Sequence, residues 1–374
     1  MSRIVLAMSG GVDSSVAAHL LCEAGHDVIG VFMRHGEQSP VATACASAGG
    51  DGGTMQLPIV DQRLDHKQGC CSASDADDGR RVADRLGIPF YALNLQNEFS
   101  RIIDYFVDEY TAGRTPNPCI ACNNWIKFGK LFDYADGVNA DYVATGHYAR
   151  LRPDGDGNLA IHRGRDAAKD QSYVLFGIDR HRLDRMMLPV GDFEKSQIRE
   201  LASQIGLSVA DKKDSQEICF VTSGKHDEFV QARRGDADRG GEIVTTDGTI
   251  VGHHPGIERF TIGQRKRLGV AMGEPRFVVR IDPDTHRVVI GTKEDLACRE
   301  LTAADATWLV EPPTEPRSCL VQIRYNSSAV PATLRPLDGD RFQIKFDRPC
   351  YGVAPGQAAV CYDSDRVLGG GWIE

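Results

Sequence analysis

The chain has 374 residues, of which 41% are hydrophobic and 25% are charged, a composition typical of a globular protein with two or three domains. No apolar run approaches the ~20 residues that cross a bilayer, and the N-terminal residues do not resemble a signal peptide. We therefore expect a cytoplasmic protein without membrane attachment, in which the 11 cysteines are thiols rather than structural disulfides.

The formal net charge of −9 argues against RNA binding as a property of the whole surface, because phosphate binding needs lysines and arginines. Any RNA contact must then come from local basic clusters, although a solvated surface is the simpler interpretation of each cluster taken alone. The candidate clusters are at 163–169, 212–213, 233–234 and 265–267.

The first half of the chain alternates strand and helix patterns, which is typical of βαβ units and a parallel sheet. A stretch rich in Gly, Ala, Ser and Asp, residues 34–69, is predicted to be a long loop or an insertion. The predicted strands are at 4–8, 28–33, 90–95 and 141–145, and the predicted helices at 14–23, 72–86, 98–110 and 123–136.

The pattern changes after about residue 205, where short alternating segments separated by Gly, Pro and Asp predict a small all-β barrel or sandwich. These segments are at 276–281, 287–290, 320–325 and 341–346. We therefore expect three domains: a nucleotide-binding domain at 1–205, a central domain at 206–284 and a C-terminal β domain at 285–374.

A glycine-rich turn joins the first predicted strand to the first helix, and residues 8–15 read MSGGVDSS. Consecutive glycines let the backbone turn tightly, and the helix start directs N–H groups and a positive dipole end at an anion. Asp13 could hold a magnesium ion that bridges phosphates. The loop lacks the Gly-Lys-Ser/Thr ending of a Walker loop, and a plain strand–turn–helix connection is the alternative interpretation.

Two cysteines lie beside features that favour a thiolate, the nucleophilic form of the side chain. Cys122 directly precedes the helix predicted at 123–136, and Lys212 and Lys213 precede Cys219 by a few residues. Both cysteines are therefore candidate catalytic residues. Taken singly, each is better explained as a small buried hydrophobe.

Several motifs together resemble a known family. The SGGVDSS segment is similar to the signature of the ATP pyrophosphatases, which cleave ATP to AMP and pyrophosphate. With the four segments that follow it, the chain resembles the tRNA-specific 2-thiouridylases (the MnmA/TrmU family). Those segments are GRTPNPCIACN at 113–123, ATGHY at 144–148, KDQSY at 169–173 and KKDSQEICF at 212–220, and further matches lie at 263–266, 324–325 and 355–357.

The resemblance implies a fold and an activity. The expected fold is α/β: a parallel-sheet domain like the adenine-nucleotide α-hydrolases, a small central domain and a C-terminal β-barrel. The expected reaction is ATP-dependent 2-thiolation of the wobble uridine of tRNA, with Mg²⁺, through adenylation of the 2-carbonyl oxygen. Cys219 would carry sulfur as a persulfide from a sulfur-relay protein or a cysteine desulfurase. Cys122 would act as nucleophile or through a transient disulfide bond with Cys219.

Positions that match the family motifs imply binding residues. The implied ATP contacts are Ala7, Met8, Ser9, Gly10, Gly11, Val12, Asp13, Ser14, Met33 and Gly146. The implied tRNA contacts are Asn117, Pro118 and Cys119 at the target base, together with Lys169, Asp170, Gln171, Arg324 and Tyr325.

One position departs from the family, because many members have Asp, a proposed acid/base group, where this chain has Cys119. Cys119, Cys122 and the distant Cys219 could supply three ligands to an iron–sulfur cluster that carries the sulfur, or Cys119 is simply a third thiol. We prefer the persulfide route and assign no other metal ligand. Two alternative functions stay open: an AMP-forming enzyme with a small-molecule substrate, or a sulfur carrier with a degenerate loop.

Overall fold

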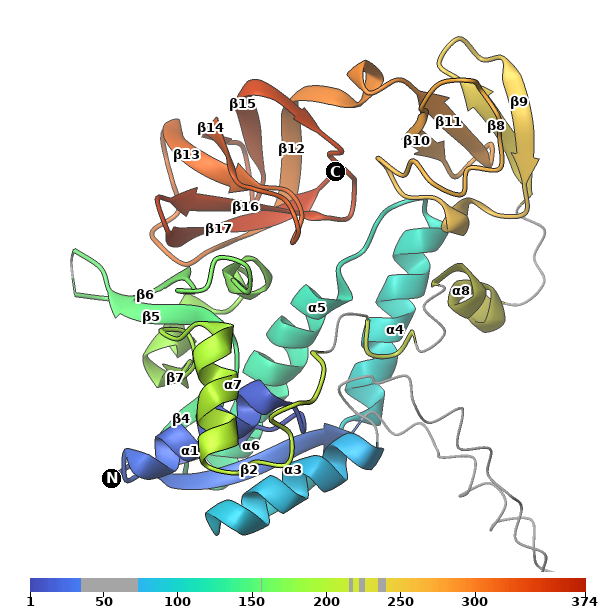
Figure 1. Cartoon of the computed structure of the whole chain (residues 1–374). Coiled ribbons are helices and arrows are strands. Elements are labelled where there is room, and N and C mark those ends of the chain that lie inside the picture. Colours follow the sequence, from blue (N-terminus) through green and yellow to red (C-terminus); the bar gives the residue numbers. More distant parts are fainter. Residues whose placement is uncertain (35–72, 156, 215–217, 222–225, 235–239) are drawn as a thin grey trace, which may run out of the picture.

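The structure is a computed structural model that describes residues 1–34, 73–155, 157–214, 218–221, 226–234 and 240–374. The insertion or loop predicted at 34–69 lies outside these residues except for its first residue. Figure 1 shows a helix-covered sheet at the N-terminal end of the chain and two separate β bodies formed by the later residues. Within the described part of the chain, no helix is both long enough and apolar enough to span a bilayer.

A parallel sheet forms the N-terminal domain, with the strand order β3–β2–β1–β4–β7. Its strands are β1 (Arg3–Ala7), β2 (Asp27–Arg34), β3 (Phe90–Asn94), β4 (Tyr142–Thr145) and β7 (Met186–Met187). Its main helices are α1 (Val12–Glu23), α3 (Ala73–Leu86), α4 (Gln96–Thr111) and α7 (Lys195–Gln204). The central strand β1 is apolar and buried because helices cover both faces of the sheet, as parallel sheets require. The predicted parallel α/β domain is confirmed.

The helix predicted at 123–136 begins earlier than expected. Three helical segments follow one another without a gap: α5 (Pro118–Ala121), the π-helix η1 (Cys122–Lys130) and α6 (Leu131–Gly137). Pro118 is the first helical residue, where its fixed φ and missing N–H are tolerated. The prediction that Cys122 precedes the helix is therefore wrong, because Cys122 lies one turn inside it.

The second sheet has the order β10–β11–β8–β9 and forms the central body. Its strands are β8 (Gly241–Thr245), β9 (Ile250–His254), β10 (Phe277–Asp282) and β11 (Arg287–Gly291). Strand β11 starts after residue 284, yet it pairs with β10 and β8. Leu207 and Val209, beyond residue 205, are buried in the core of the N-terminal domain. The pairing and packing therefore favour boundaries later than 205 and 284.

The third sheet closes on itself, because β12 pairs with both β15 and β17. This six-stranded barrel contains β12 (Ala297–Trp308), β13 (Arg317–Gln322), β14 (Val330–Pro336), β15 (Phe342–Tyr351), β16 (Ala358–Asp363) and β17 (Arg366–Ile373). A hairpin from the N-terminal domain, β5 (Ala149–Pro153) and β6 (Leu159–Arg163), extends the sheet through the pair His162 and Arg366. The predicted C-terminal β-barrel is confirmed.

The remaining helical elements are short. They are η2 (Ser172–Leu175), η3 (Arg180–Arg185), α8 (His226–Arg234), η4 (Ile257–Arg259) and η5 (Glu294–Leu296).

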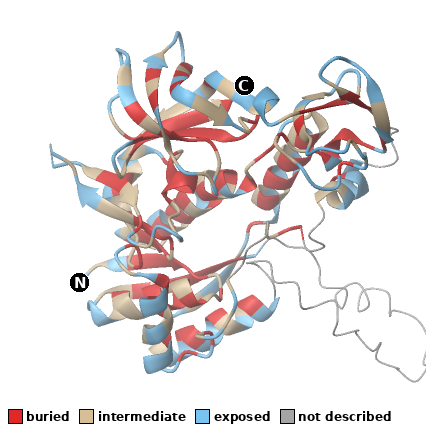
Figure 2. Cartoon of the chain, turned by 45° about the horizontal axis from the view of Figure 1, so that its top comes forward, coloured by how far each residue is buried: buried red, intermediate tan, exposed pale blue. Residues whose placement is uncertain are grey.

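The barrel faces the N-terminal domain with buried segments, drawn in red in Figure 2, and polar contacts join the two. The fully buried Tyr173 donates its hydroxyl to the Ala358 carbonyl at 3.0 Å. The Gln357 side chain donates from Nε2 to the carbonyls of Thr115 and Pro116, at 2.9 and 3.2 Å. A loop of the barrel therefore holds the segment that leads into α5, three residues before Cys119.

We predict that Tyr173→Phe lowers the free energy of unfolding by about 1–3 kcal/mol, because the buried Ala358 carbonyl loses the hydroxyl as a partner. Tyr91→Phe is the matched control: this ring is 51% exposed, so its loss of a hydroxyl should change stability by less than about 0.5 kcal/mol. Urea unfolding followed by tryptophan fluorescence measures both variants. Equal midpoints for the two variants would contradict this interface.

Candidate active site

The phosphate loop is preformed by contacts that begin at its glycines. Gly10 has φ of +68°, and a Cβ there would lie 2.0 Å from the Asp75 carbonyl oxygen, so only glycine fits. The Ser14 and Ser15 hydroxyls both donate to the Gly11 carbonyl, at 3.1 and 2.8 Å. The first N–H groups of α1, which lack partners within the helix, therefore open onto a fixed turn. The predicted glycine-rich turn between strand and helix is present, and its role as an anion cradle stays a prediction.

The remaining predicted nucleotide contacts lie around this turn. Met8 and Val12 are buried, and their side chains belong to the core under the loop. They can contribute only main-chain groups to a ligand. Ala7 is the last residue of β1 and Met33 the last but one of the neighbouring strand β2, and they are 7% and 8% exposed. Gly146 follows β4 at the same edge of the sheet.

Gly146 and His147 connect the phosphate loop to the cysteine helix. A Cβ at Gly146 would lie 2.7 Å from the Ser14 amide nitrogen, so the chain after β4 touches the start of α1. The next residue, His147, is buried and contacts Thr145 Oγ1 through Nδ1 at 2.7 Å. Its Nε2 lies 3.5 Å from the Lys127 ammonium on η1. The helix that carries Cys122 is thereby positioned beside the anion cradle.

The protonation of His147 follows from these partners. A lysine ammonium can only donate, so Nε2 accepts and the proton lies on Nδ1, where it is donated to Thr145. Burial first, and the positive charge of Lys127 second, hold the pKa of His147 well below its usual value. His147 is therefore neutral at physiological pH.

Lys127 lies five residues after Cys122, a spacing that places both residues on one face of a π-helix.

The three cysteines of predicted chemistry all lie within the described residues. Cys119 is exposed, whereas Cys122 and Cys219 are half-buried and pack against the same hydrophobic core. The ring of Phe220 lies 5.2 Å from that of Phe106 on α4, and α4 packs against α5 and η1. The segments that carry Cys122 and Cys219 therefore both contact α4. Among the described residues, no three His, Cys, Asp or Glu side chains are grouped as metal ligands.

Asp13, the predicted magnesium ligand, is already neutralised. The Lys195 ammonium donates to both of its carboxylate oxygens at 2.8 Å, and the Tyr148 hydroxyl donates to one of them at 2.6 Å. Burial first, and the negative charge of Asp13 second, raise the pKa of Tyr148, so this hydroxyl stays a donor. As it stands, the Asp13 carboxylate is not presented as a bare metal ligand.

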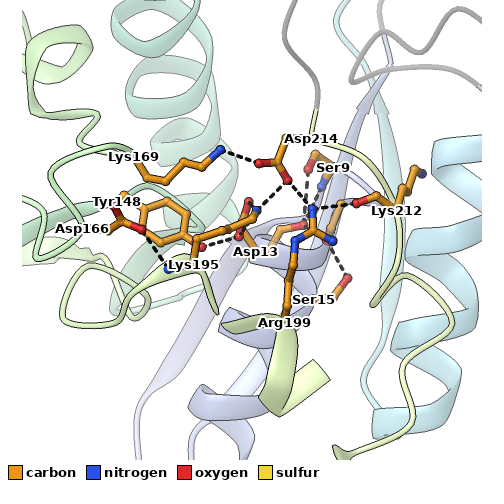
Figure 3. Close-up of polar contacts among 12 residues, drawn as sticks. Ser9, Asp13, Ser15, Tyr148, Asp166, Lys169, Lys195, Arg199, Lys212 and Asp214 are labelled. Atoms are coloured by element: carbon orange, nitrogen blue, oxygen red, sulfur yellow. Dashed lines mark hydrogen bonds and ion pairs between the residues drawn. The ribbon is translucent and has the colours of Figure 1, made fainter. Parts of the chain in front are cut away.

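Asp214 gathers three cations beside the phosphate loop, as Figure 3 shows. Its carboxylate lies 2.7 Å from the Lys169 ammonium and 2.8 Å from both the Lys195 ammonium and the Arg199 guanidinium. Burial alone would raise the pKa of Asp214, but the hydrogen bonds from Lys169 and Lys195 outweigh it and lower the pKa to about 2. Lys195 thus joins Asp13 of the phosphate loop to Asp214, five residues before Cys219.

Lys212 forms a second link from the same segment to the loop. Its ammonium donates to the Gly10 carbonyl at 3.0 Å and to the carboxylates of Asp75 and Asp78 at 2.6 Å. The prediction that Lys212 favours a thiolate at Cys219 is therefore not supported, because α3 holds this charge. This segment therefore contacts the phosphate loop at two points: Lys212 binds Gly10, and Asp214 is linked to Asp13 through Lys195.

The predicted tRNA contacts at 169–171 have partners inside the protein. Lys169 pairs with Asp214, and Asp170 accepts hydrogen bonds from Arg163 and from the Ser172 hydroxyl. The Gln171 side chain accepts from the Tyr148 main-chain amide at 2.9 Å. All three side chains are therefore held by contacts within the protein.

The predicted tRNA contacts Arg324 and Tyr325 lie in the loop after β13, and their surroundings differ. Arg324 donates to the carbonyls of Gly352 and Ile262, at 3.0 and 2.7 Å, and so links the barrel to the central body. Tyr325 is 39% exposed, and burial first, with charges including Cys119 after it, raises its pKa. Asn117 precedes α5 as its N-cap residue. Tyr325 therefore offers an exposed aromatic ring near the cysteine helix.

Sequence reasoning missed Lys195, Arg199 and Lys127 as site residues. Lys195 and Arg199 lie on α7, whose start is marked by a capping box between Glu194 and Gln197. That box identifies the helix but gives no sign of its charged partners. Lys127 belongs to the quoted cysteine motif, and a five-residue spacing from Cys122 is informative only once a π-helix is known.

A parallel-sheet domain with a glycine-rich turn before α1, joined to a central β body and a closed barrel, defines a multidomain α/β protein whose turn lacks the Gly-Lys-Ser/Thr ending of a Walker loop. Three domain families match: "tRNA methyl transferase HUP domain" at 2–51 and 49–223, "tRNA methyl transferase PRC-barrel domain" at 227–292 and "Aminomethyltransferase beta-barrel domain" at 298–373. The chain belongs to the tRNA-specific 2-thiouridylase (MnmA) family.

Relatives cover the chain from end to end. The tRNA-specific 2-thiouridylase MnmA of Rhodopirellula baltica is 60% identical, with 100% of this chain and 96% of that protein covered. The proteins of the same name from Geobacter metallireducens and Clostridium perfringens are 46% and 43% identical, again over 100% of this chain and over 96% and 98% of theirs. A solved 4-thiouridine synthetase–RNA complex with bound ATP aligns at a TM-score of 0.37 and 16% identity, covering 62% of this chain and 50% of that one, too distant to carry an argument.

We predict that Gly146→Ala weakens ATP binding at least about tenfold, because the added Cβ meets main-chain atoms of α1 that cannot move aside. Gly137→Ala, at the end of α6, is the matched control, since nothing lies within 4 Å of its Cβ position. Calorimetric titration of ATP measures both affinities, with thermal unfolding as a check on folding. An unchanged affinity for Gly146→Ala would show that this contact does not shape the site.

The lowered pKa of His147 predicts a pH effect on stability. Below pH ~6.5 the His147 imidazole is protonated in the unfolded chain but stays neutral in the folded protein. The free energy of unfolding therefore falls as the pH drops, by up to about 1.4 kcal/mol per pH unit. His147→Gln should therefore lose less stability than the native protein between about pH 7.5 and 5.5. Thermal unfolding across this range measures the difference, and parallel curves for the two proteins would contradict the neutral assignment.

Proposed function

We propose that this chain is a tRNA-uridine 2-sulfurtransferase that consumes ATP and thiolates the wobble uridine. One observation supports it above the others: the contacts from Ser14 through Gly146 and His147 to Lys127 bring an anion cradle beside the helix of Cys122. The full-length similarity to proteins named tRNA-specific 2-thiouridylase supports the choice of substrate. Neither a small-molecule ligase nor a sulfur carrier explains both features.

The first step is adenylation of the base. The 2-carbonyl of uridine is urea-like and a poor electrophile, so its oxygen attacks the α-phosphorus of ATP and pyrophosphate leaves. The preformed turn and the N-terminus of α1 favour the phosphates, which we expect to contact Ser9, Gly10, Gly11 and Ser14. The oxygen, now part of AMP, has become a good leaving group.

The second step is sulfur transfer. We assign Cys219 as the persulfide carrier: its terminal sulfur attacks C2 of the uridine, and AMP departs with the oxygen. The Cys122 thiolate then attacks the Cys219 sulfur, which releases 2-thiouridine and leaves a disulfide between the two cysteines. Alternatively, Cys122 attacks the persulfide first and liberates sulfide as the nucleophile. A thiol reductant resets the disulfide, and a sulfur-relay protein or cysteine desulfurase reloads Cys219.

Two metal-dependent ideas fit the residues less well. Lys195 and Tyr148 already donate hydrogen bonds to the Asp13 carboxylate. We therefore assign no step to a protein-held Mg²⁺ and expect the ion to bind together with ATP. An iron–sulfur cluster would need Cys119, Cys122 and Cys219 as a ligand group, and the described residues contain no group of three such side chains. The persulfide route is therefore the one we propose.

The proposed tRNA contacts are the aromatic side chain of Tyr325 and the residues at the start of α5. Tyr325 is exposed near Cys119, and an aromatic ring can stack on a base splayed out of the anticodon loop. Asn117 and Pro118, at the start of α5, lie one turn before Cys122. We expect the target uridine between this ring and the cysteines.

We predict that Cys122→Ser and Cys219→Ser each lower 2-thiouridine formation at least about 100-fold, because serine is a far weaker nucleophile at neutral pH. Cys298→Ser, a half-buried barrel cysteine, is the matched control and should keep its activity. Mass spectrometry of tRNA nucleosides after reaction with ATP and a sulfur donor measures the product.

Three outcomes would contradict the proposal in different ways. Thiolation by both serine variants would eliminate the cysteine route. Stoichiometric iron and sulfide in anaerobically purified, active protein would favour the cluster. AMP formation that does not depend on tRNA would favour a small-molecule substrate.

A further inference from the structure

Asp214, five residues before Cys219, is linked to the phosphate loop by ion pairs. Asp214 binds Lys195, and Lys195 binds Asp13, so two carboxylates share one ammonium at 2.8 Å each. Lys195 is 8% exposed, which makes these charge-assisted contacts stronger than surface ion pairs. Figure 3 shows Lys195 between the two carboxylates.

Asp214 draws more positive charge than it can neutralise. Lys169, Lys195 and Arg199 bring three positive charges to the cluster, while Asp214 and Asp13 bring two negative charges. All three cations surround one carboxylate, and Lys195 links that carboxylate to the turn that we expect to hold phosphates. A polyphosphate is the kind of anion that such a cluster attracts.

A triphosphate on the loop competes with Asp214 for the same cations. Lys195 contacts Asp13 in the first turn of α1, so it is the closest of the three cations to the loop. If Lys195 turns toward phosphate oxygens, its contact with Asp214 weakens, because one ammonium has only three donors. In that event Asp214 loses a cation that it holds in the absence of ATP.

We propose that Asp214 is a positioning residue that competes internally with the ATP phosphates and so couples nucleotide binding to the segment carrying Cys219. The inference rests on the proposed function, because it needs ATP at the loop and sulfur on Cys219. It assigns Asp214 two opposing effects: it weakens ATP binding, and it holds Cys219 in register with the adenylated base.

Asp214→Asn tests both effects, since it keeps the shape and removes the charge. ATP should bind about threefold or more tightly, because Lys169, Lys195 and Arg199 are freed for phosphate. Thiolation should instead slow, and the ratio of AMP to 2-thiouridine should rise above that of the native protein. A purely structural role predicts weaker ATP binding, so the direction of the change in affinity is diagnostic.

Asp211→Asn is the matched control, because Asp211 is exposed and lies three residues earlier with the same change in charge. It should leave both the affinity and the product ratio unchanged. If Asp214→Asn fails to fold, Asp214→Asn combined with Lys169→Met restores the local charge balance and should bind ATP more tightly than Lys169→Met alone. Thermal unfolding identifies which variants are folded.

ATP affinity is measured with a non-hydrolysable analogue and no tRNA, so this arm does not depend on turnover. ATP binding by Asp214→Asn that is equal to or weaker than that of Asp211→Asn would overturn the inference. An unchanged ratio of AMP to 2-thiouridine would remove the coupling to Cys219. Native protein that binds ATP but never thiolates tRNA would instead refute the proposed function.

Discussion

The ammonium group of Lys195 links the charged residues beside the phosphate loop. It is nearly buried and contacts Asp13 at the phosphate loop and Asp214 before Cys219. A buried charge of this kind is costly unless it is fully paired, and removing one partner leaves the others uncompensated. The loop, helix α7 and the cysteine-bearing segment are therefore interdependent, although they are far apart in the sequence. A ligand that changes the partners of Lys195 affects all three.

The barrel positions the chain that leads into the helix of Cys122. Gly356 has φ of +84°, and a Cβ there would lie 3.0 Å from Arg114, so the barrel loop touches the chain before α5. Thr115 donates its amide to the Pro355 carbonyl at 2.8 Å, and Gln357 binds the carbonyls of Thr115 and Pro116. The position of Cys119 thus depends on residues some 240 positions later in the sequence.

Local patterns predicted the parallel sheet, the barrel and the glycine-rich turn before α1, because glycine placement and strand periodicity are encoded within short segments. They did not predict the start of α5: the helix was expected from residue 123, but it begins at Pro118, because proline is well suited to a first helical residue. They also missed Lys195 and the true partners of Lys212. Ion pairs depend on which distant segments meet, and the spacing of residues in one helix does not contain that information.

The paired charges also constrain how an acidic chain binds RNA. Arg163, Lys169, Lys212 and Arg234, from three of the basic clusters in the sequence, are held by carboxylates, which reduces what they offer to phosphate. The fourth cluster, residues 265–267, is exposed on the central body, and Arg267 has φ of +61°. We expect the RNA backbone to contact surfaces other than these paired cations, so a chain of net charge −9 needs local basic patches and not a broadly basic face.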